Sequence, residues 1–153
     1  MSNDNYSACV DLGVGLRAFF AAAPAVRALA FDVARDELRM SPSYLPQGET
    51  LPAIVYHEIS SESDQTFDGR TGIAHTRVQL DCYGSTALAA QSLRLACEVA
   101  IQGYRGPAGN EQILSVTLSN RRSDIQPRMD GTDEHDHIRM VDLMISHREA
   151  VQV

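Results

Sequence analysis

Hydrophobic residues near the start of the chain recur with the period of a helix. They occupy positions i, i+4, i+7, i+8 and i+11, namely Leu12, Leu16, Phe19, Phe20 and Ala23, so one helical face is apolar. Pro24 ends this helix and can open a second short one, because proline loses no needed hydrogen bond at the first helical position. We expect residues 1–9 to be a flexible N-terminus and residues 34–44 to be irregular or briefly extended.

The pattern then changes to alternation, which predicts two strands separated by a polar segment. Pro46 and Gly48 make a turn, and Pro52 favours an extended chain, so a strand begins at about Ala53 in AIVYHEIS. The second strand alternates over residues 72–84, with an inward set of Ala74, Thr76, Val78, Leu80 and Cys82. The segment SESDQTFDGRT between them is too long for a tight hairpin turn and too polar to bury, so we expect a projecting, mobile arm.

A helix and two further strands complete the pattern. Ser85 is a favourable N-cap for an alanine-rich amphipathic helix that follows it. QILSVTLSN then alternates, and HIRMVDLMISH places Val141, Leu143 and Ile145 on one face. The predicted order is helix, helix, strand, strand, helix, strand, strand. It favours a single α+β domain over residues 1–153, a sandwich of a roughly four-stranded, mainly antiparallel sheet backed by helices.

Composition fits one globular domain and argues against nucleic acid as a tightly bound partner. The 153 residues are 44% hydrophobic, which suffices for a buried core. The net charge of −7 opposes binding to a phosphate backbone. Cys9, Cys82 and Cys97 are too few and too scattered for a disulfide framework. The sequence has no secretory signal and no apolar run that could span a membrane, so we expect a chain made in a cytoplasm, without a membrane partner.

One cluster in the sequence could carry metal chemistry. Residues 130–137, DGTDEHDH, combine carboxylates and imidazoles, which suit a divalent ion. Their spacing matches neither an EF-hand nor a helical HExxH motif, so a solvated acidic loop is the other interpretation. The sequence contains no GxSxG nucleophile motif and no glycine-rich phosphate loop. We therefore expect no enzymatic activity and no cofactor.

Three motifs together resemble the siphophage tail-completion family, whose members are also called tail-terminator or head-to-tail joining proteins. They are the LPQG-x-x-LP bracket at Leu45 to Pro52, the strand Val78 to Tyr83 leading into an alanine-rich helix, and the R-x-x-D spacing of Arg139 and Asp142. The resemblance covers most of residues 12–149. Tyr83 departs from it, since tryptophan is at least as common at that position.

The resemblance implies a small subunit that assembles with itself into a ring, usually a hexamer, at the head-proximal end of a long non-contractile tail. Such a ring stops polymerisation of the tail-tube protein, offers a docking surface to the head connector and lets DNA pass through its lumen. The family brings no catalytic residues. We therefore expect a virion protein of a phage, prophage or gene-transfer particle, made in the bacterial host. Another neck protein, such as a head-closure or adaptor subunit, and a metal-binding module are the alternatives.

Two polar excursions from the predicted sheet, Glu62 to Thr71 and Arg121 to Asp136, are the candidate interface or lumen surfaces. A polar arm can reach a neighbouring subunit, and an acidic channel lets DNA slide without sticking. In the second excursion we expect a loop that carries a basic patch of arginines. We also expect Pro46 and Pro52 to stiffen the entry to an edge strand. The candidate residues are Asp64, Phe67, Asp68, Arg70, Arg121, Arg122 and Arg128.

Overall fold

The computed structural model describes residues 4–67, 69–128 and 133–148, with the backbone alone at residues 4–11, 66 and 70. Its helices are α1 (Asp4–Ala22), α2 (Pro24–Ala30) and α3 (Ala87–Ile101). Its short strands are β1 (Phe31–Asp32), β2 (Glu37–Leu38), β3 (Met40–Pro42) and β6 (Gly106–Ala108). Its long strands are β4 (Ala53–Thr66), β5 (Gly69–Gly84), β7 (Glu111–Pro127) and β8 (His135–Arg148).

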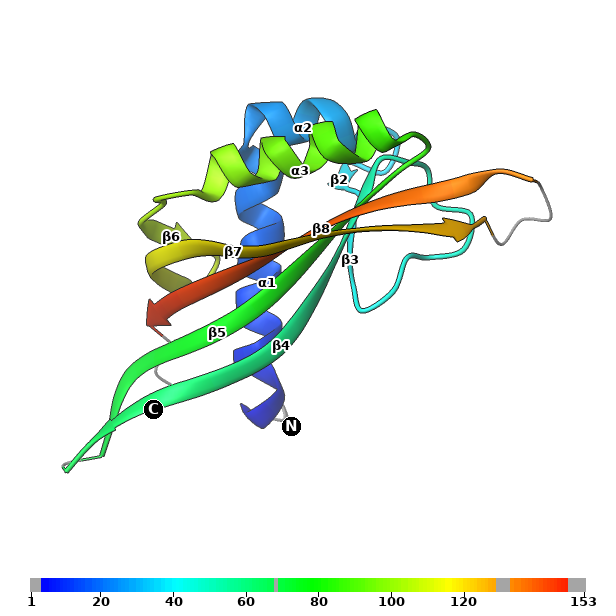
Figure 1. Cartoon of the computed structure of the whole chain (residues 1–153). Helices are drawn as coiled ribbons and strands as arrows, with labels where there is room; N and C mark the ends of the chain where they lie inside the picture. Colours follow the sequence, from blue (N-terminus) through cyan, green and yellow to red (C-terminus); the bar gives the residue numbers. More distant parts are fainter. Residues whose placement is uncertain (1–3, 68, 129–132, 149–153) are drawn as a thin grey trace.

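The main sheet is mixed and strongly twisted, with its helices beside it (Figure 1). Within the described residues it has six strands in the order β3-β4-β5-β8-β7-β6, and β1 and β2 form a separate two-stranded sheet. The pair β3–β4 is parallel, whereas the other neighbours are antiparallel. The predicted four-stranded sandwich and its element order are therefore wrong. Strands of two or three residues hold too few positions to show a period of two, so alternation could not reveal them.

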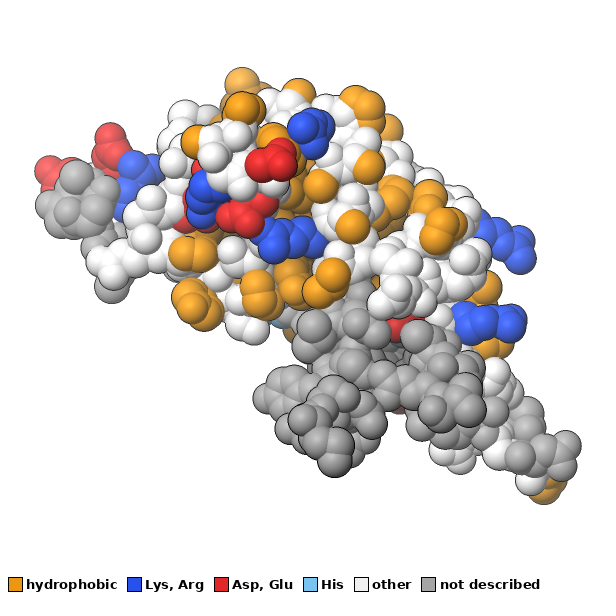
Figure 2. Space-filling view, turned by 180° about the vertical axis from the view of Figure 1, so that it is seen from behind, with side chains coloured by type: hydrophobic (Ala, Val, Ile, Leu, Met, Phe, Trp, Pro, Cys, Tyr) orange, Lys and Arg blue, Asp and Glu red, His pale blue; other side chains and the backbone are white. Residues whose placement is uncertain are grey.

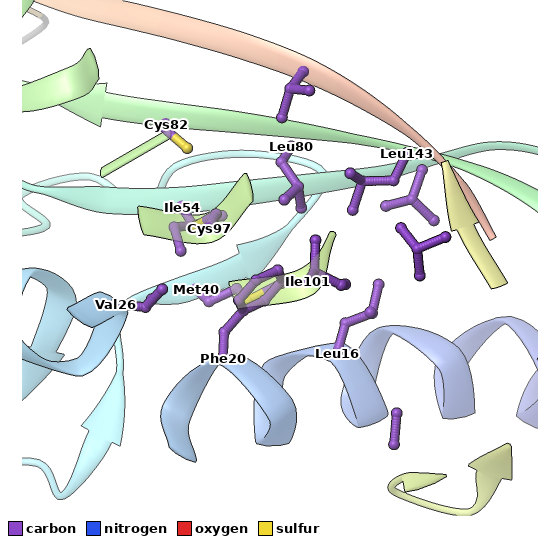
Figure 3. Packing of buried hydrophobic residues seen from close by; sticks show 14 of the residues in the cluster. Leu16, Phe20, Val26, Met40, Ile54, Leu80, Cys82, Cys97, Ile101 and Leu143 are labelled. Carbon is purple, nitrogen blue, oxygen red and sulfur yellow. The ribbon is translucent and has the colours of Figure 1, made fainter. Parts of the chain in front are cut away.

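The helices cover one face of the sheet and enclose the core. Leu16 and Phe20 of α1 and Leu93 and Ile101 of α3 are fully buried in one core cluster with side chains of the long strands. Leu16, Phe20 and Ile101 are seen in Figure 3 together with Leu80 and Leu143 of β5 and β8. The predicted inward set of β5 is buried, as are Val141, Leu143 and Ile145 of β8. A smaller cluster on the other face contains Val55, Tyr83 and Ile138, against which Leu45 and Leu51 of the preceding loop pack.

Two glycines in DLGVGL permit the close approach of α1 to the sheet. A Cβ on Gly15 would lie 2.2 Å from the carbonyl oxygen of Ala108 in β6, and a Cβ on Gly13 would lie 2.5 Å from the ring of Tyr56. Either contact is far shorter than a van der Waals distance. These glycines therefore serve helix packing.

Several predicted boundaries are confirmed. Helix α1 ends before Pro24, which stands in the first turn of α2, and β4 begins at Ala53. Helix α1 begins at Asp4, inside the stretch expected to be flexible. The N-cap of α3 is Thr86 rather than Ser85, because the Thr86 hydroxyl accepts a hydrogen bond from the backbone N–H of Ala89 at 3.1 Å.

No single helix in the described part of the chain is long and apolar enough to cross a membrane. The segments Leu12–Ala22 and Pro24–Ala30 pass that test as a pair, with a bend of 93° between them.

Candidate assembly surfaces

The first polar excursion is a β-hairpin rather than a long loop. Strand β4 continues to Thr66 and β5 starts at Gly69, with Thr66 paired to Gly69. Gly69 has φ +118°, a conformation that glycine adopts readily and other residues avoid. Strand β8 joins β5 at Ile73, so residues 64–72 project beyond the rest of the sheet as a two-stranded ribbon (Figure 1). We call residues 64–72 the arm.

His75 braces the base of the arm. Its Nε2 lies 3.0 Å from both carboxylate oxygens of Asp64, and its Nδ1 lies 2.7 Å from the hydroxyl of Ser146 on β8. The Thr71 hydroxyl also donates a hydrogen bond to the Asp64 carbonyl oxygen at 3.3 Å. The predicted interface residue Asp64 is therefore already engaged within its own subunit, and these contacts set the direction in which the arm leaves the sheet.

The tip of the arm carries a bare aromatic ring. Phe67 is fully exposed, with a relative accessibility of 111%. Arg70 lies on β5 opposite Gln65, where the structure describes its backbone. Asp68 lies outside the described residues. A fully exposed phenylalanine at the end of a polar hairpin is unusual for an isolated subunit, because burying such a ring is favourable.

A chain of hydrogen bonds, buried except at its Ser61 end, joins the four long strands behind the arm. The Ser61 hydroxyl lies 2.9 Å from that of Thr76, which lies 2.8 Å from Nε2 of His147, and Nδ1 of His147 lies 3.0 Å from Glu111 Oε2. A hydroxyl, imidazole and carboxylate in this order can activate a nucleophile. However, Thr76, His147 and Glu111 are at most 3% exposed, which leaves no room for a substrate. The chain instead fixes the strands relative to each other.

The second excursion is also a hairpin, and the prediction of a loop is wrong for Arg121 and Arg122, whereas Arg128 lies beyond the end of the strand. Arg121 and Arg122 lie within β7, which extends to Pro127. A register shift between Leu118 and Arg121 marks a bulge in the pairing with β8. A bulge changes the face of the sheet toward which the following side chains point. This change cannot be inferred from the alternation of the sequence. The predicted basic patch does not form, because neighbouring arginines on a strand point to opposite faces.

Arg121 points toward α3 and binds Glu98, which is 4% exposed. The Arg121 Nε donates to Glu98 Oε1 at 2.7 Å and its Nη2 donates to Oε2 at 3.2 Å. The hydrogen bond to Glu98 raises the pKa of the Arg121 guanidinium, and the nearby carboxylate charge adds to this shift. Arg94 approaches the same carboxylate, with its Nε 3.6 Å from Glu98 Oε1. Arg121 therefore ties β7 to α3.

Arg122 belongs to a polar network on the face of the sheet away from the helices. Its Nη2 donates to Gln79 Oε1 at 2.6 Å, and Gln79 Nε2 donates to Asp81 Oδ1 at 2.7 Å. The other oxygen of Asp81 lies 3.0 Å from Nε2 of His57 on β4. This network links β7, β5 and β4 across the open face.

On the same face, Arg77 binds the fully buried Asp142. Among the described atoms, Oδ1 of that carboxylate has no hydrogen-bond partner.

Arg128 closes the far end of the second hairpin. It forms ion pairs with Glu134 and, at 2.9 Å, with Asp136. The loop from Leu45 to Leu51 faces this end, and the two border a hollow of about 730 Å³. Residues 130–132 of the candidate metal cluster lie outside the described residues. Among residues 133–137 and the rest of the described chain, no three His, Cys, Asp or Glu side chains could hold a metal ion together.

Sequence reasoning missed His75, Glu98, Glu111 and His147, the polar residues that organise both hairpins. A usable signal existed for Glu111, which starts β7 on the same side as the buried Ile113, whereas Glu98 lies beside the apolar stripe of α3 and not on it. A charged residue at a buried position requires a partner. The sequence could not name those partners, which lie 23 and 36 positions away.

The architecture has a counterpart among solved structures. A chain from the structure of the virion of a native gene transfer agent (GTA) particle matches with a TM-score of 0.63 at 14% sequence identity. The match covers 95% of this chain and 99% of that chain. At this identity the likeness establishes the fold. No curated protein matches the chain.

The sequence itself matches a family. The model of the family "Tail completion protein gp17" matches residues 14–136, from α1 to the start of β8. This range contains two of the three motifs that carry the resemblance, the Leu45 to Pro52 bracket and the Val78 to Tyr83 strand, and the family match confirms the resemblance. The chain belongs to the tail completion protein gp17 family and is a structural protein of a phage-type tail.

Proposed function

We propose that the chain forms a homo-oligomeric ring, a hexamer, at the head-proximal end of a phage or phage-like tail. The ring ends polymerisation of the tail-tube protein and joins the tail to the head connector, and DNA passes through its lumen. The observation that carries this proposal is the family match over residues 14–136. The protein acts by assembly and without catalysis, and it is made in the cytoplasm of the bacterial host.

The free edges of the sheet support assembly. In the described chain, β3 pairs with β4 at Ile54 to Tyr56, and β6 pairs with β7 at Glu111 to Ile113. Beyond these short strands, residues 57–66 of β4 and 115–127 of β7 form the outer edges of the sheet. Long exposed edges invite pairing with another chain, and a closed ring is one way to cover them.

The strand directions permit this pairing between identical subunits. Strands β4, β5, β8 and β7 are successively antiparallel, so β4 and β7 run in opposite directions. If a second copy continues the sheet, its β4 lies antiparallel to β7 of the first. At about 3.3 Å per residue, the free edge of β4 is roughly 33 Å long and that of β7 roughly 43 Å, so β4 of one copy can pair along most of the free edge of β7 of the other. The same contact repeated from copy to copy generates a ring if the rotation closes.

Charge supports the passage of DNA. Each subunit carries −7, so a hexamer carries about −42 before any partner binds. A polyanion slides through an acidic channel without tight contacts, because phosphate binding requires clustered cations. Arg121, Arg122 and Arg128 do not supply such a cluster, since each is engaged by a side chain of its own subunit.

The proposal is tested by native mass spectrometry and light scattering of the purified chain, alone and with its tail-tube protein. The expected result is a closed oligomer of six copies, formed alone or on addition of the tube protein. A chain that stays monomeric in both conditions contradicts the proposal. A ring that binds the portal side and not the tube would reassign the chain as a head-closure or adaptor subunit.

A further inference from the structure

An apolar groove lies where α1, α3 and β6 meet. It has a volume of about 620 Å³, and its lining includes Ala18, Phe19, Ala22, Tyr104, Pro107 and Ala108. The rings of Phe19 and Tyr104 pack with their centroids 4.4 Å apart, and the Tyr104 hydroxyl donates to the Pro107 carbonyl oxygen at 2.6 Å. These contacts hold the walls in place, so the groove is already formed in the single subunit. Figure 2 shows that hydrophobic side chains also reach the surface on the face of the molecule seen from behind.

The arm carries a group that suits such a groove. Phe67 at its tip is fully exposed, and the arm itself is a two-stranded ribbon, which is marginally stable in water without further support. Phenylalanine is enriched at the centres of protein interfaces because it buries a large area and loses little rotational freedom. The tip therefore has the features of an interface anchor.

The charges of the arm and of the groove's border are complementary. Residues 64–72 include Asp64 and Asp68 against Arg70 alone, a net charge of −1. Arg105 follows the groove residue Tyr104 in the chain and is exposed. Opposite charges at the border of a contact accelerate association and fix its orientation.

The topology brings the tip of a second copy to the groove. When β4 of one copy lies antiparallel to β7 of another, its C-terminal end at Thr66 runs toward the N-terminal end of β7. There the free edge ends, because β6 covers Glu111 to Ile113. Pro107 and Ala108 of β6 also line the groove. The tip of the neighbouring arm thus arrives where the groove begins.

We propose that Phe67 of each subunit inserts into the groove between α1, α3 and β6 of the next subunit and locks the ring. This inference rests on the proposed ring and specifies the contact that closes it. The occupant is a second copy of this chain, because the tip and the groove lie at positions that the edge pairing brings together. Each subunit offers one tip and one groove, so every contact is used once around a closed ring.

Substitution on both sides tests the contact by its effect on oligomer mass. Phe67→Ala removes the anchor, and Ala22→Trp fills the groove with a bulky ring at a position that is exposed in the single subunit. Each is expected to weaken association between subunits by about 30-fold or more, as loss of a central anchor does. Val33→Ala, at another exposed apolar residue, and Ala25→Trp, at an exposed alanine outside the groove lining, are matched controls that leave association unchanged. Far-ultraviolet circular dichroism verifies that each variant is folded.

Photo-crosslinking identifies the occupant directly. A photoreactive phenylalanine analogue at position 67 is expected to capture residues 18–23 or 104–109 of a second copy in the assembled oligomer. Capture of another surface of the chain, or of added tail-tube protein instead, overturns the inference while the ring itself stands. A wild-type chain that never forms an oligomer overturns both the inference and the ring. Unchanged association of both Phe67→Ala and Ala22→Trp also overturns the inference.

Discussion

The buried hydrogen-bond chain behind the arm provides a quantitative test of how the long strands are held together. Thr76 is 1% exposed, and its hydroxyl is the link between Ser61 and His147. Thr76→Val keeps the shape and the preference for a strand but removes the hydroxyl, so Nε2 of His147 is left without its partner in a buried site. An unsatisfied buried polar group costs about 1–3 kcal/mol, so the free energy of unfolding is expected to fall by about that amount.

The measurement is urea unfolding followed by circular dichroism at a fixed protein concentration, because assembly contributes to apparent stability. Thr117→Val is the matched control on an exposed position of β7, and it is expected to change the free energy by less than about 0.5 kcal/mol. A double-mutant cycle with Glu111→Gln is expected to show coupling of about 0.5–3 kcal/mol. If Thr76→Val is neutral or stabilising, the chain of hydrogen bonds does not hold the strands together.

Three further predictions address the core, a buried thiol and the arm. Leu93→Ala in α3 is expected to lower the free energy of unfolding by about 2–5 kcal/mol in the same assay, whereas Leu95→Ala, on the exposed face, changes it by less than about 1 kcal/mol. The hydrogen bond with Cys97 and burial raise the pKa of the Cys82 thiol well above its ordinary value. The neutral Cys82 thiol stabilises the folded state below the ordinary thiol pKa, and this stabilisation is lost as the pH rises through the raised pKa of the folded protein. Cys82 should therefore resist alkylation at pH 9 until urea unfolds the protein, and rapid labelling of the native protein would contradict this. His75→Ala removes the brace of the arm, so trypsin is expected to cut the arm several-fold faster while unfolding in urea changes little, and unchanged cleavage would show that the brace is not needed.

Elements with a clear hydrophobic period could be predicted from the sequence. Helix α3 shows small and apolar residues at helical spacing, and β5 alternates over most of its length, so each was placed nearly to its ends. The alternation shows which face of β5 is buried because the helices cover that face alone.

The hairpin ends could not be predicted for a physical reason. Where both faces of a strand are exposed to water, as at the arm, the sequence has no cause to alternate and resembles a loop. The bulge before Arg121 likewise hid the end of β7, because it shifts the alternation of inward and outward side chains within the strand. The pairing of Arg121 with Glu98 depends on this shift, so alternation could not predict it.

Polymerisation of the tail-tube protein, followed by negative-stain electron microscopy, shows whether this chain ends tail growth. The tube protein is allowed to assemble with increasing amounts of this chain, and the lengths and ends of the tubes are recorded. Tubes are expected to stop growing as the chain is added, and one end is expected to carry a ring-shaped cap. An unchanged length distribution, with no added density at either end, would rule out a role in ending the tail.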